Sequence, residues 1–351
     1  MIDFRYHLVS IVAVFLALAI GIVLGSTELQ GDTIDALRSS SNLLRSELSA
    51  SNNQRDGYKQ QLDADQQFLQ APGVEQRLLA NELTGTRIVL VTEPGASSVV
   101  ISGIEQAAGL AGATVTGQVS IQPKFNNLSA ATQSSLSQIN SDLASADGTV
   151  LATPANEQTI YQQQAAQLIG TAILATTAGG ETTGLSAADA TTLLGAYAQA
   201  GYLTITPGVI NRATLAVIVT PDTAPADGPN DPATQVLLAV AQEFAGASAA
   251  TVVVGSTAGS SPAGSAISVL RASSAASLVS TVDNADVIIG WVSTIWALQE
   301  QLGGGKPNSY GISGASAVSP VPSTVPSATP TISPSPHPTK TGKGAKSVKK
   351  K

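Results

Sequence analysis

The apolar segment near the N-terminus decides which compartment the rest of the chain can occupy. From Leu8 to Leu24 only one side chain, Ser10, is polar. A bilayer-spanning helix needs about 17–25 apolar residues, and Phe4 and Tyr6 stand where membrane helices favour aromatic side chains. We therefore expect residues 1–26 to form a transmembrane signal anchor. Its apolar surface includes Leu8, Val12, Phe15, Leu18, Ile22 and Leu24.

Two alternatives remain open for this segment. Residues 23–25 are compatible with signal-peptide cleavage, and a buried core helix would have a similar composition. If the segment is retained, Arg5 and the amino terminus lie on one side of it, and the acidic residues Glu28 and Asp32 lie on the other. The positive-inside rule then predicts a single-pass protein of the cell membrane, with a cytoplasmic N-terminus and an extracytoplasmic body.

A heptad-like spacing follows the anchor. Alternating steps of three and four residues from 34 to 69 pass through eleven positions, seven of them apolar. This is the a/d pattern of a coiled coil, so we expect residues 27–71 to be a stalk that forms a homodimer. Because Arg55 and Asp65 interrupt the seam, a helix packed on its own domain and a solvated spacer remain alternatives. The apolar seam positions are Ile34, Leu37, Leu44, Leu48, Tyr58, Leu62 and Leu69.

Residues 72–305 have the pattern of an α/β body, in which short β-rich runs alternate with Ala-rich helical runs. Such alternation is typical of a sheet with helices on both faces, and a Pro-Gly break suggests two halves divided near residue 207. The expected strands are 87–92, 114–120, 149–152, 171–175, 213–220, 251–255 and 286–291. The expected helices are 74–83, 98–110, 129–143, 186–200, 232–245 and 293–302.

Composition limits the chemistry of this body. The chain has no Cys, its one Met is Met1, and its two His are His7 and His337. The body therefore lacks the side chains for cysteine or histidine catalysis and for a soft copper site. Asp283 and Asp286 allow a hard-cation loop, but an Asx turn or a helix cap before the next strand explains them more simply. We expect no catalytic residues, no metal ligands, no cofactor and no enzymatic activity.

The turn at residues 92–97 also falls where nucleotide-binding folds hold phosphate, between a strand and a helix. It lacks the glycine-rich fingerprint of those folds, and an ordinary turn with a helix cap accounts for it. The sequence therefore gives no specific indication of a nucleotide-binding site at this turn.

The C-terminal segment differs in composition from the body. Residues 306–351 are dominated by Pro, Ser, Thr and Gly, and six lysines fall within residues 340–351. We expect a disordered tail, whose lysines either contact anionic wall polymers or lipids or simply keep the tail solvated. Without these lysines, residues 1–339 carry a net charge of −13, although the whole chain is only −7. So acidic a surface excludes nucleic acid as a partner.

Several stretches resemble a known family. They are the opening MIDFRYHLVSIVAVFLALAIGIVLGS, residues 87–95 and 266–271, the STVDN stretch at 280–284, Gly290, Ala297-Leu298, and Tyr310-Gly311. Over residues 1–320 the chain resembles the actinobacterial copper transport protein B (MctB-like) family. The resemblance implies a cell-envelope protein of copper homeostasis, described as an outer-membrane copper channel, and brings no motif-defined catalytic residues.

Two functional hypotheses follow. The first is a membrane-anchored envelope protein of copper homeostasis or efflux, with copper as a partner only through the family resemblance and no soft copper site in its own body. The second is a non-catalytic structural or docking protein that binds an envelope partner during envelope assembly or division. A carboxylate enzyme using Asp283 and Asp286 is a more distant third.

Overall fold

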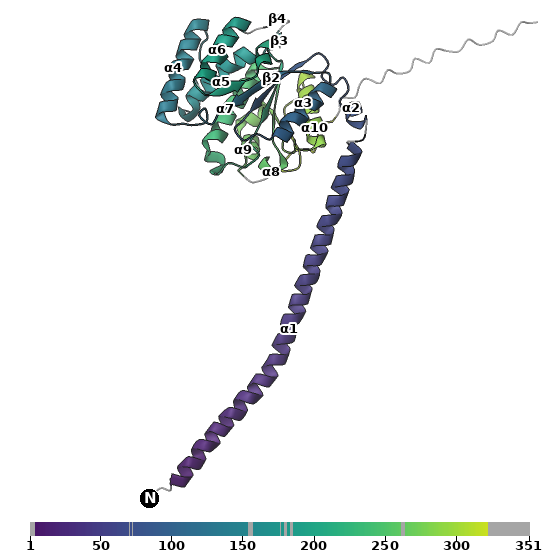
Figure 1. Ribbon diagram of the computed structural model, residues 1–351, viewed down its shortest axis with the longest axis vertical. Helices are drawn as coiled ribbons and strands as arrows, with labels where there is room; N and C mark the ends of the chain where they lie inside the picture. Colours follow the sequence, from purple (N-terminus) through teal and green to yellow (C-terminus); the bar gives the residue numbers. More distant parts are fainter. Residues whose placement is uncertain are drawn as a thin grey trace, which may run out of the picture.

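The computed structural model describes residues 4–69, 71, 73–153, 157–175, 177–178, 181–182, 185–260 and 264–321. A single long helix, α1 (Phe4–Leu69), leads to an α/β domain at its C-terminal end (Figure 1). The helix runs without interruption because the sequence between its ends contains no proline. The segments expected to form the anchor and the stalk therefore lie in one continuous helix.

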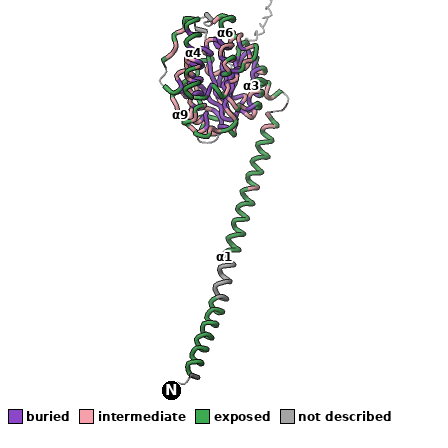
Figure 2. Tube along the Cα trace, turned by 60° about the vertical axis from the view of Figure 1, so that its left-hand side comes forward, coloured by how far each residue is buried: buried purple, intermediate pink, exposed green. Residues whose placement is uncertain are grey.

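Among the described residues, helix α1 contacts the rest of the chain mainly at its C-terminal end, where it meets α2 and α10. Residues Tyr6–Gly25 are long and apolar enough to cross a membrane, and none of them is buried (Figure 2). Most described side chains after residue 34 are also exposed until the helix reaches the domain, where Leu69 packs against its core. An apolar surface of this length is unfavourable in water, so the Tyr6–Gly25 segment is consistent with a single-pass membrane helix.

The domain is built on one seven-stranded sheet with the strand order β5-β2-β1-β6-β7-β8-β9. All neighbouring strands are parallel except β2 and β5, which pair antiparallel. A separate two-stranded ribbon joins β3 (Thr177–Ala178) to β4 (Glu181–Thr182). The strands of the main sheet are β1 (Arg87–Thr92), β2 (Thr114–Ile121), β5 (Leu203–Ile205), β6 (Leu215–Val219), β7 (Ala250–Val254), β8 (Ser280–Val282) and β9 (Ser309–Tyr310).

Helices cover both faces of this sheet, as the sequence predicts. Along β1, Ile88 and Leu90 belong to one core, whereas Val89 and Val91 belong to the other. The first core includes α2 (Val74–Leu79), α3 (Ser98–Leu110) and α10 (Ile288–Leu302). The second includes α4 (Ala130–Asp147), α5 (Ile160–Ile173), α6 (Ala187–Gln199), α7 (Pro232–Ala247) and α9 (Ala266–Ala272). Burial on both faces explains why the central strands β1, β6 and β7 consist almost entirely of apolar residues.

Short helical turns complete the connections. They are α8 (Thr257–Ser260) and the 3-10 turns Glu157–Thr159, Pro207–Asn211, Gly228–Asn230 and Ser274–Ser277.

Three expected strands are wrong. Residues 149–152 lie outside any strand, residues 171–173 are the end of α5, and residues 288–291 begin α10. The last two are apolar runs in helices that are buried on several sides, and a short apolar run has no period that separates a buried helix from a buried strand. The sequence also misses five strands, β3, β4, β5, β8 and β9, and each of them consists of only two or three residues.

The expected tail begins later than residue 306. Ser309–Tyr310 form β9 at the edge of the sheet, beside β8. The Tyr310 side chain is buried in the core shared with α10, and its hydroxyl donates a hydrogen bond to Glu300. One buried aromatic residue and a pair of strand contacts hold this segment, although its composition is that of a linker. The rest of the expected tail, from residue 322, lies outside the described residues.

Strands from both sides of residue 207 enter the same sheet, since β1 pairs directly with β6. The Pro207–Asn211 turn packs against β2, where a side chain at Gly117 would collide with Thr206 and Val209.

Candidate functional site at the carboxyl edge of the sheet

The strand order creates a crevice at the carboxyl ends of β1 and β6. From β1 the chain passes to β2 on one side, and it later returns to place β6 on the other side of β1. The loops that leave β1 and β6 therefore diverge. In open parallel sheets ligands bind at such a switch in strand order, so this crevice is the first place to look for a site.

A tight turn fixes the chain as it leaves β1. The Ala96 amide donates to the Glu93 carbonyl at 3.0 Å. Pro94 occupies the second position of this turn, and Gly95 occupies the third with φ +83°. Proline followed by a residue with positive φ is the signature of a type II turn. The Asp222 amide then donates to the Gly95 carbonyl at 2.9 Å, which ties this turn to the loop after β6.

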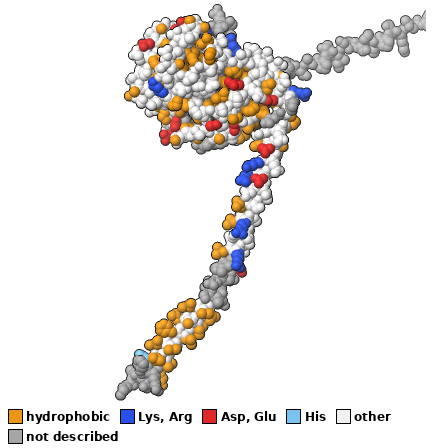
Figure 3. Space-filling model, viewed as in Figure 1, with side chains coloured by type: hydrophobic (Ala, Val, Ile, Leu, Met, Phe, Trp, Pro, Cys, Tyr) orange, Lys and Arg blue, Asp and Glu red, His pale blue; other side chains and the backbone are white. Residues whose placement is uncertain are grey.

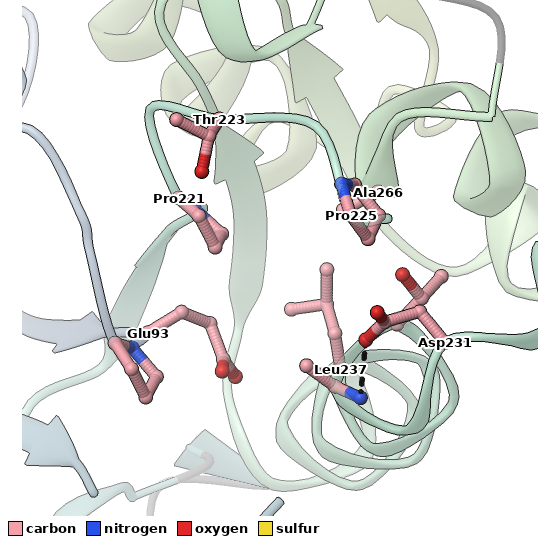
Figure 4. Close-up of a pocket in the computed structure, with 10 residues that line it drawn as sticks. Glu93, Pro221, Thr223, Pro225, Asp231, Leu237 and Ala266 are labelled. Carbon is pink, nitrogen blue, oxygen red and sulfur yellow. Dashed lines mark hydrogen bonds between the residues drawn. The ribbon is translucent and has the colours of Figure 1, made fainter. Parts of the chain in front are cut away.

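A cavity of about 160 Å³ lies between these two loops and the start of α7; we call it the switch-point pocket. Its apolar walls include Pro94, Pro221, Pro225 and Leu237. Its polar lining consists of Glu93, Thr223, Asp231 and Thr234. In the close-up, the Glu93 side chain extends from the end of β1 toward α7, and Asp231 stands on the opposite side of the opening (Figure 4).

Glu93 is almost fully buried, at 3% exposed. Its Oε2 accepts a hydrogen bond from Asn126 Nδ2 at 2.9 Å. Loss of hydration raises the pKa of the Glu93 carboxyl to about 7, and the Asn126 hydrogen bond offsets only part of that rise. The carboxyl is therefore poised to gain or lose a proton near neutral pH.

Two buried polar atoms of this pocket have no hydrogen-bond partner among the described residues. They are Glu93 Oε1 and Thr234 Oγ1, from residues that are both at most 3% exposed. Buried polar atoms are nearly always satisfied, so these two mark a place where a water molecule or a ligand completes the hydrogen bonding. Asn126 Oδ1, next to Glu93, is also buried and has no hydrogen-bond partner among the described residues.

The start of α7 does not offer the usual binding site for an anion. Pro232, at the first helical position, has no amide hydrogen. The Asp231 carboxylate accepts from the Ala233 amide at 2.9 Å, so it already occupies the place where a phosphate would bind. Together with Glu93, this makes the pocket suited to a hydrogen-bond donor or a cation rather than to a phosphate.

The anchor residues that the sequence singles out lie on an exposed helical surface. Leu8, Val12, Phe15, Leu18, Ile22 and Leu24 are all 55% exposed or more. Figure 3 shows the continuous apolar band that they form with their neighbours at the free end of α1.

The described seam residues of the stalk are separated into two groups. Leu37, Leu44, Leu48, Tyr58 and Leu62 are more than half exposed, and Leu37, Leu44 and Leu48 line one shallow groove along α1. Leu69 instead packs against the domain of its own chain. The side chain of Ile34 lies outside the described residues.

Asp283 and Asp286 do not share a ligand site. Asp283 is fully buried and forms an ion pair with Arg271 at 2.7 Å. It also accepts from the amides of Ile312 and Ser313 at 2.7 and 2.9 Å. Asp286 caps α8 by accepting from the amide and hydroxyl of Thr257. The cap and turn interpretation of these residues therefore fits the geometry, and the cation loop does not.

Arg271 completes a clamp on the last described segment. It donates to the carbonyl oxygens of Tyr310 and Ser313, each at 2.7 Å. Within the part of the chain that the structure describes, no group of three His, Cys, Asp or Glu side chains could hold a metal ion.

Sequence reasoning missed Glu93, Asn126 and Thr234 as a set. The residue pattern of the turn at 92–97 suggests either a phosphate loop or an ordinary turn with a helix cap, and neither interpretation uses its acidic residue. A useful signal was present, because Glu93 directly follows an apolar strand in a body with few charges. Asn126 lies in the loop after β2 and Thr234 in the first turn of α7, so they come near Glu93 only through the strand order.

Comparison with known proteins gives the family. Residues 1–322 match the family described as "Copper transport outer membrane protein, MctB". The chain belongs to the MctB family. The protein "Copper transporter MctB" of Mycobacterium tuberculosis is 32% identical over 321 residues, which cover 91% of this chain and 98% of the relative. The MctB protein of Mycobacterium leprae is 30% identical over 326 residues, covering 91% and 99%.

The MctB match includes every feature described above. It begins at the membrane segment, contains the stalk and the switch-point pocket, and ends just beyond the Arg271 clamp. The resemblance noted in the sequence is therefore confirmed over nearly all the described chain.

Proposed function

We propose that this chain is a membrane-anchored cell-envelope protein that takes part in copper homeostasis. The observation that carries this proposal is membership of the MctB family over residues 1–322, with relatives named copper transporter matched along nearly their whole length. The apolar Tyr6–Gly25 helix supports attachment to a membrane.

In this proposal the copper role is indirect. The chain has no Cys, and its Met and His residues all lie outside the α/β domain. Cu(I) prefers thiolate, thioether and imidazole ligands, so the domain offers none of its preferred donors. The domain would instead act by binding a partner or a small molecule, with no catalytic step of its own.

Orientation follows from charge. Arg5 precedes the membrane segment, whereas Glu28, Asp32 and Asp35 follow it. We infer that the N-terminus is cytoplasmic and that the stalk and domain are outside the cell membrane.

The stalk is proposed to pair with a second copy of this chain. Its exposed leucines recur at coiled-coil spacing, and anchors in one membrane would hold the two stalks parallel. The shallow groove lined by Leu37, Leu44 and Leu48 is the surface through which we expect the two stalks to contact each other. The stalk would then place two domains at a distance from the membrane, an arrangement that also suits the docking role in envelope assembly.

The test of the copper role uses a deletion strain and the full chain purified in detergent. We expect the deletion to change copper tolerance and cellular copper content, and the purified protein to carry no stoichiometric copper. Unchanged tolerance and content would refute the copper role, and one tightly bound copper ion per chain would refute the indirect mechanism.

The stalk test uses the natural absence of cysteine. Leu44→Cys and Leu48→Cys should give disulfide-linked dimers in membranes under mild oxidation. Ser46→Cys is the matched control, because position 46 lies on the opposite face of the helix. Equal crosslinking at all three positions, or none at 44 and 48, would contradict pairing through this seam.

A further inference from the structure

The switch-point pocket has the chemistry of a small-molecule site, and its features select one class of ligand. Its two ionisable lining residues, Glu93 and Asp231, are both acids, and none of the described residues that line the cavity is a lysine, arginine or histidine. The remaining contacts come mainly from three prolines, alanine and leucine. A ligand that fits must therefore present hydrogen-bond donors or positive charge to the acids and carbon surface to the walls.

We propose that the switch-point pocket binds a small organic molecule that carries a protonated amino group on an apolar body. The amino group would donate to Glu93 Oε1 and Thr234 Oγ1, two buried atoms of the pocket lining that have no hydrogen-bond partner among the described residues. The apolar body would lie against Pro221, Pro225 and Leu237. This site is independent of the copper role proposed above.

Size supports an organic ligand of a few heavy atoms. The cavity of about 160 Å³ is smaller than the roughly 300–1,000 Å³ of drug-sized pockets. It would hold an amine of amino-acid size or smaller, or the amino end of a longer molecule that extends through the opening.

A bare divalent cation fits less well. Mg²⁺ and Ca²⁺ take six or more oxygen ligands, whereas the cavity offers two carboxylates on opposite sides and two threonine hydroxyls (Figure 4). A phosphate fits still less well, because Glu93 and Asp231 would repel it and Pro232 lacks an amide hydrogen.

Glu93 is suited to charge pairing with such a ligand. A buried carboxylate without a counter-charge is costly, which is why burial raises the pKa of Glu93. An ammonium group would favour the ionised carboxylate, so binding near neutral pH should release protons. Asp231, the other acid of the lining, already accepts a backbone hydrogen bond, and α9 contributes only Ala266 to the lining.

The test is a titration of the full chain in detergent with propylamine and isobutylamine, monitored by ligand-observed NMR and calorimetry. Propanol and isobutanol are the neutral controls of similar shape; inorganic phosphate and Mg²⁺ are the ionic controls. We expect saturable binding of the amines only. The heat of binding should change with the ionisation enthalpy of the buffer, because protons are released.

Single substitutions test whether the amines bind in the switch-point pocket. Glu93→Gln, which keeps the shape of the side chain, should weaken amine binding at least tenfold, and Thr234→Val should weaken it by a smaller factor. Asp147→Asn, an exposed acid at the end of α4, is the matched control and should leave binding unchanged. Circular dichroism and thermal melts confirm folding of each variant.

Three results would overturn the proposal. They are alcohols that bind as tightly as the amines, amine binding that survives in Glu93→Gln, and saturable binding of Mg²⁺ or phosphate without amine binding. Absence of amine binding up to about 50 mM would also overturn it, because a specific fragment site is expected to reach millimolar affinity, about −4 kcal/mol.

Discussion

Glu93 couples the stability of the domain to pH. Its pKa is 4.5 when the chain is unfolded and about 7 when burial removes its hydration. Between these values the folded chain keeps a proton that the unfolded chain has lost, so stability falls as pH rises. The stabilisation is complete below pH 4.5 and is lost above pH 7. A shift of this size corresponds to about 3 kcal/mol.

Glu93→Gln should remove this dependence. The free energy of unfolding of the variant, relative to the wild type, should increase by about 3 kcal/mol between pH 4 and pH 8. Urea denaturation of both proteins at a series of pH values measures the difference, and contributions from other groups, such as the raised pKa of Glu82, cancel. Parallel pH curves would show that Glu93 is not buried as described.

The Arg271 clamp leads to a second prediction at single residues. Removing the carboxylate with Asp283→Ala leaves Arg271 without its counter-charge and removes the acceptor of two amides. Breaking a buried ion pair in this way costs about 3–5 kcal/mol. Thermal melts should show a large decrease in the melting temperature of Asp283→Ala. In contrast, Asp35→Ala, which breaks the exposed ion pair with Arg38, should leave the melting temperature of the domain unchanged. Similar melts for both variants would refute the structural role of the clamp.

Packing between elements can be tested at α3 and α10. An added Cβ at Gly103 would lie 2.0 Å from the Trp291 ring, so Gly103→Ala should force α10 away and cost about 1–3 kcal/mol. Gly109→Ala in the same helix meets no atom within 4 Å and should stabilise by up to about 1 kcal/mol. Denaturation measurements that gave both variants the same sign would contradict the close packing of α3 on α10.

The elements differ in how far their sequences predict them. Helix α3 is predicted at its observed bounds. Ser97 is a residue type that is favoured just before a helix, and Val100 and Ile104 recur at helical spacing. The start of α10 is taken for a strand, because Ile288 and Ile289 suit either structure and only tertiary burial decides between them. The pocket is predicted least, since its residues come from loops that are neighbours only through the strand order.

For the whole molecule, the sequence identifies the membrane helix and both covered faces of the sheet, because these depend on long patterns of polarity. The end of the domain depends instead on single contacts. Tyr310 is buried, and Gly311 has φ +124° with Asp283 so close that any side chain would collide with it. Composition averages over such positions, so a domain boundary predicted from composition falls before β9.

This boundary gives the last prediction. A chain that ends after Lys306 loses β9, the Tyr310 side chain and the two carbonyl acceptors of Arg271. Burial of one large side chain alone contributes about 1.5–3 kcal/mol, so this truncation should lower the melting temperature of the domain by several degrees. A chain that ends after Val321 keeps all these contacts and should melt like the full chain. If both truncations melt alike, residues 309–317 are not part of the folded domain.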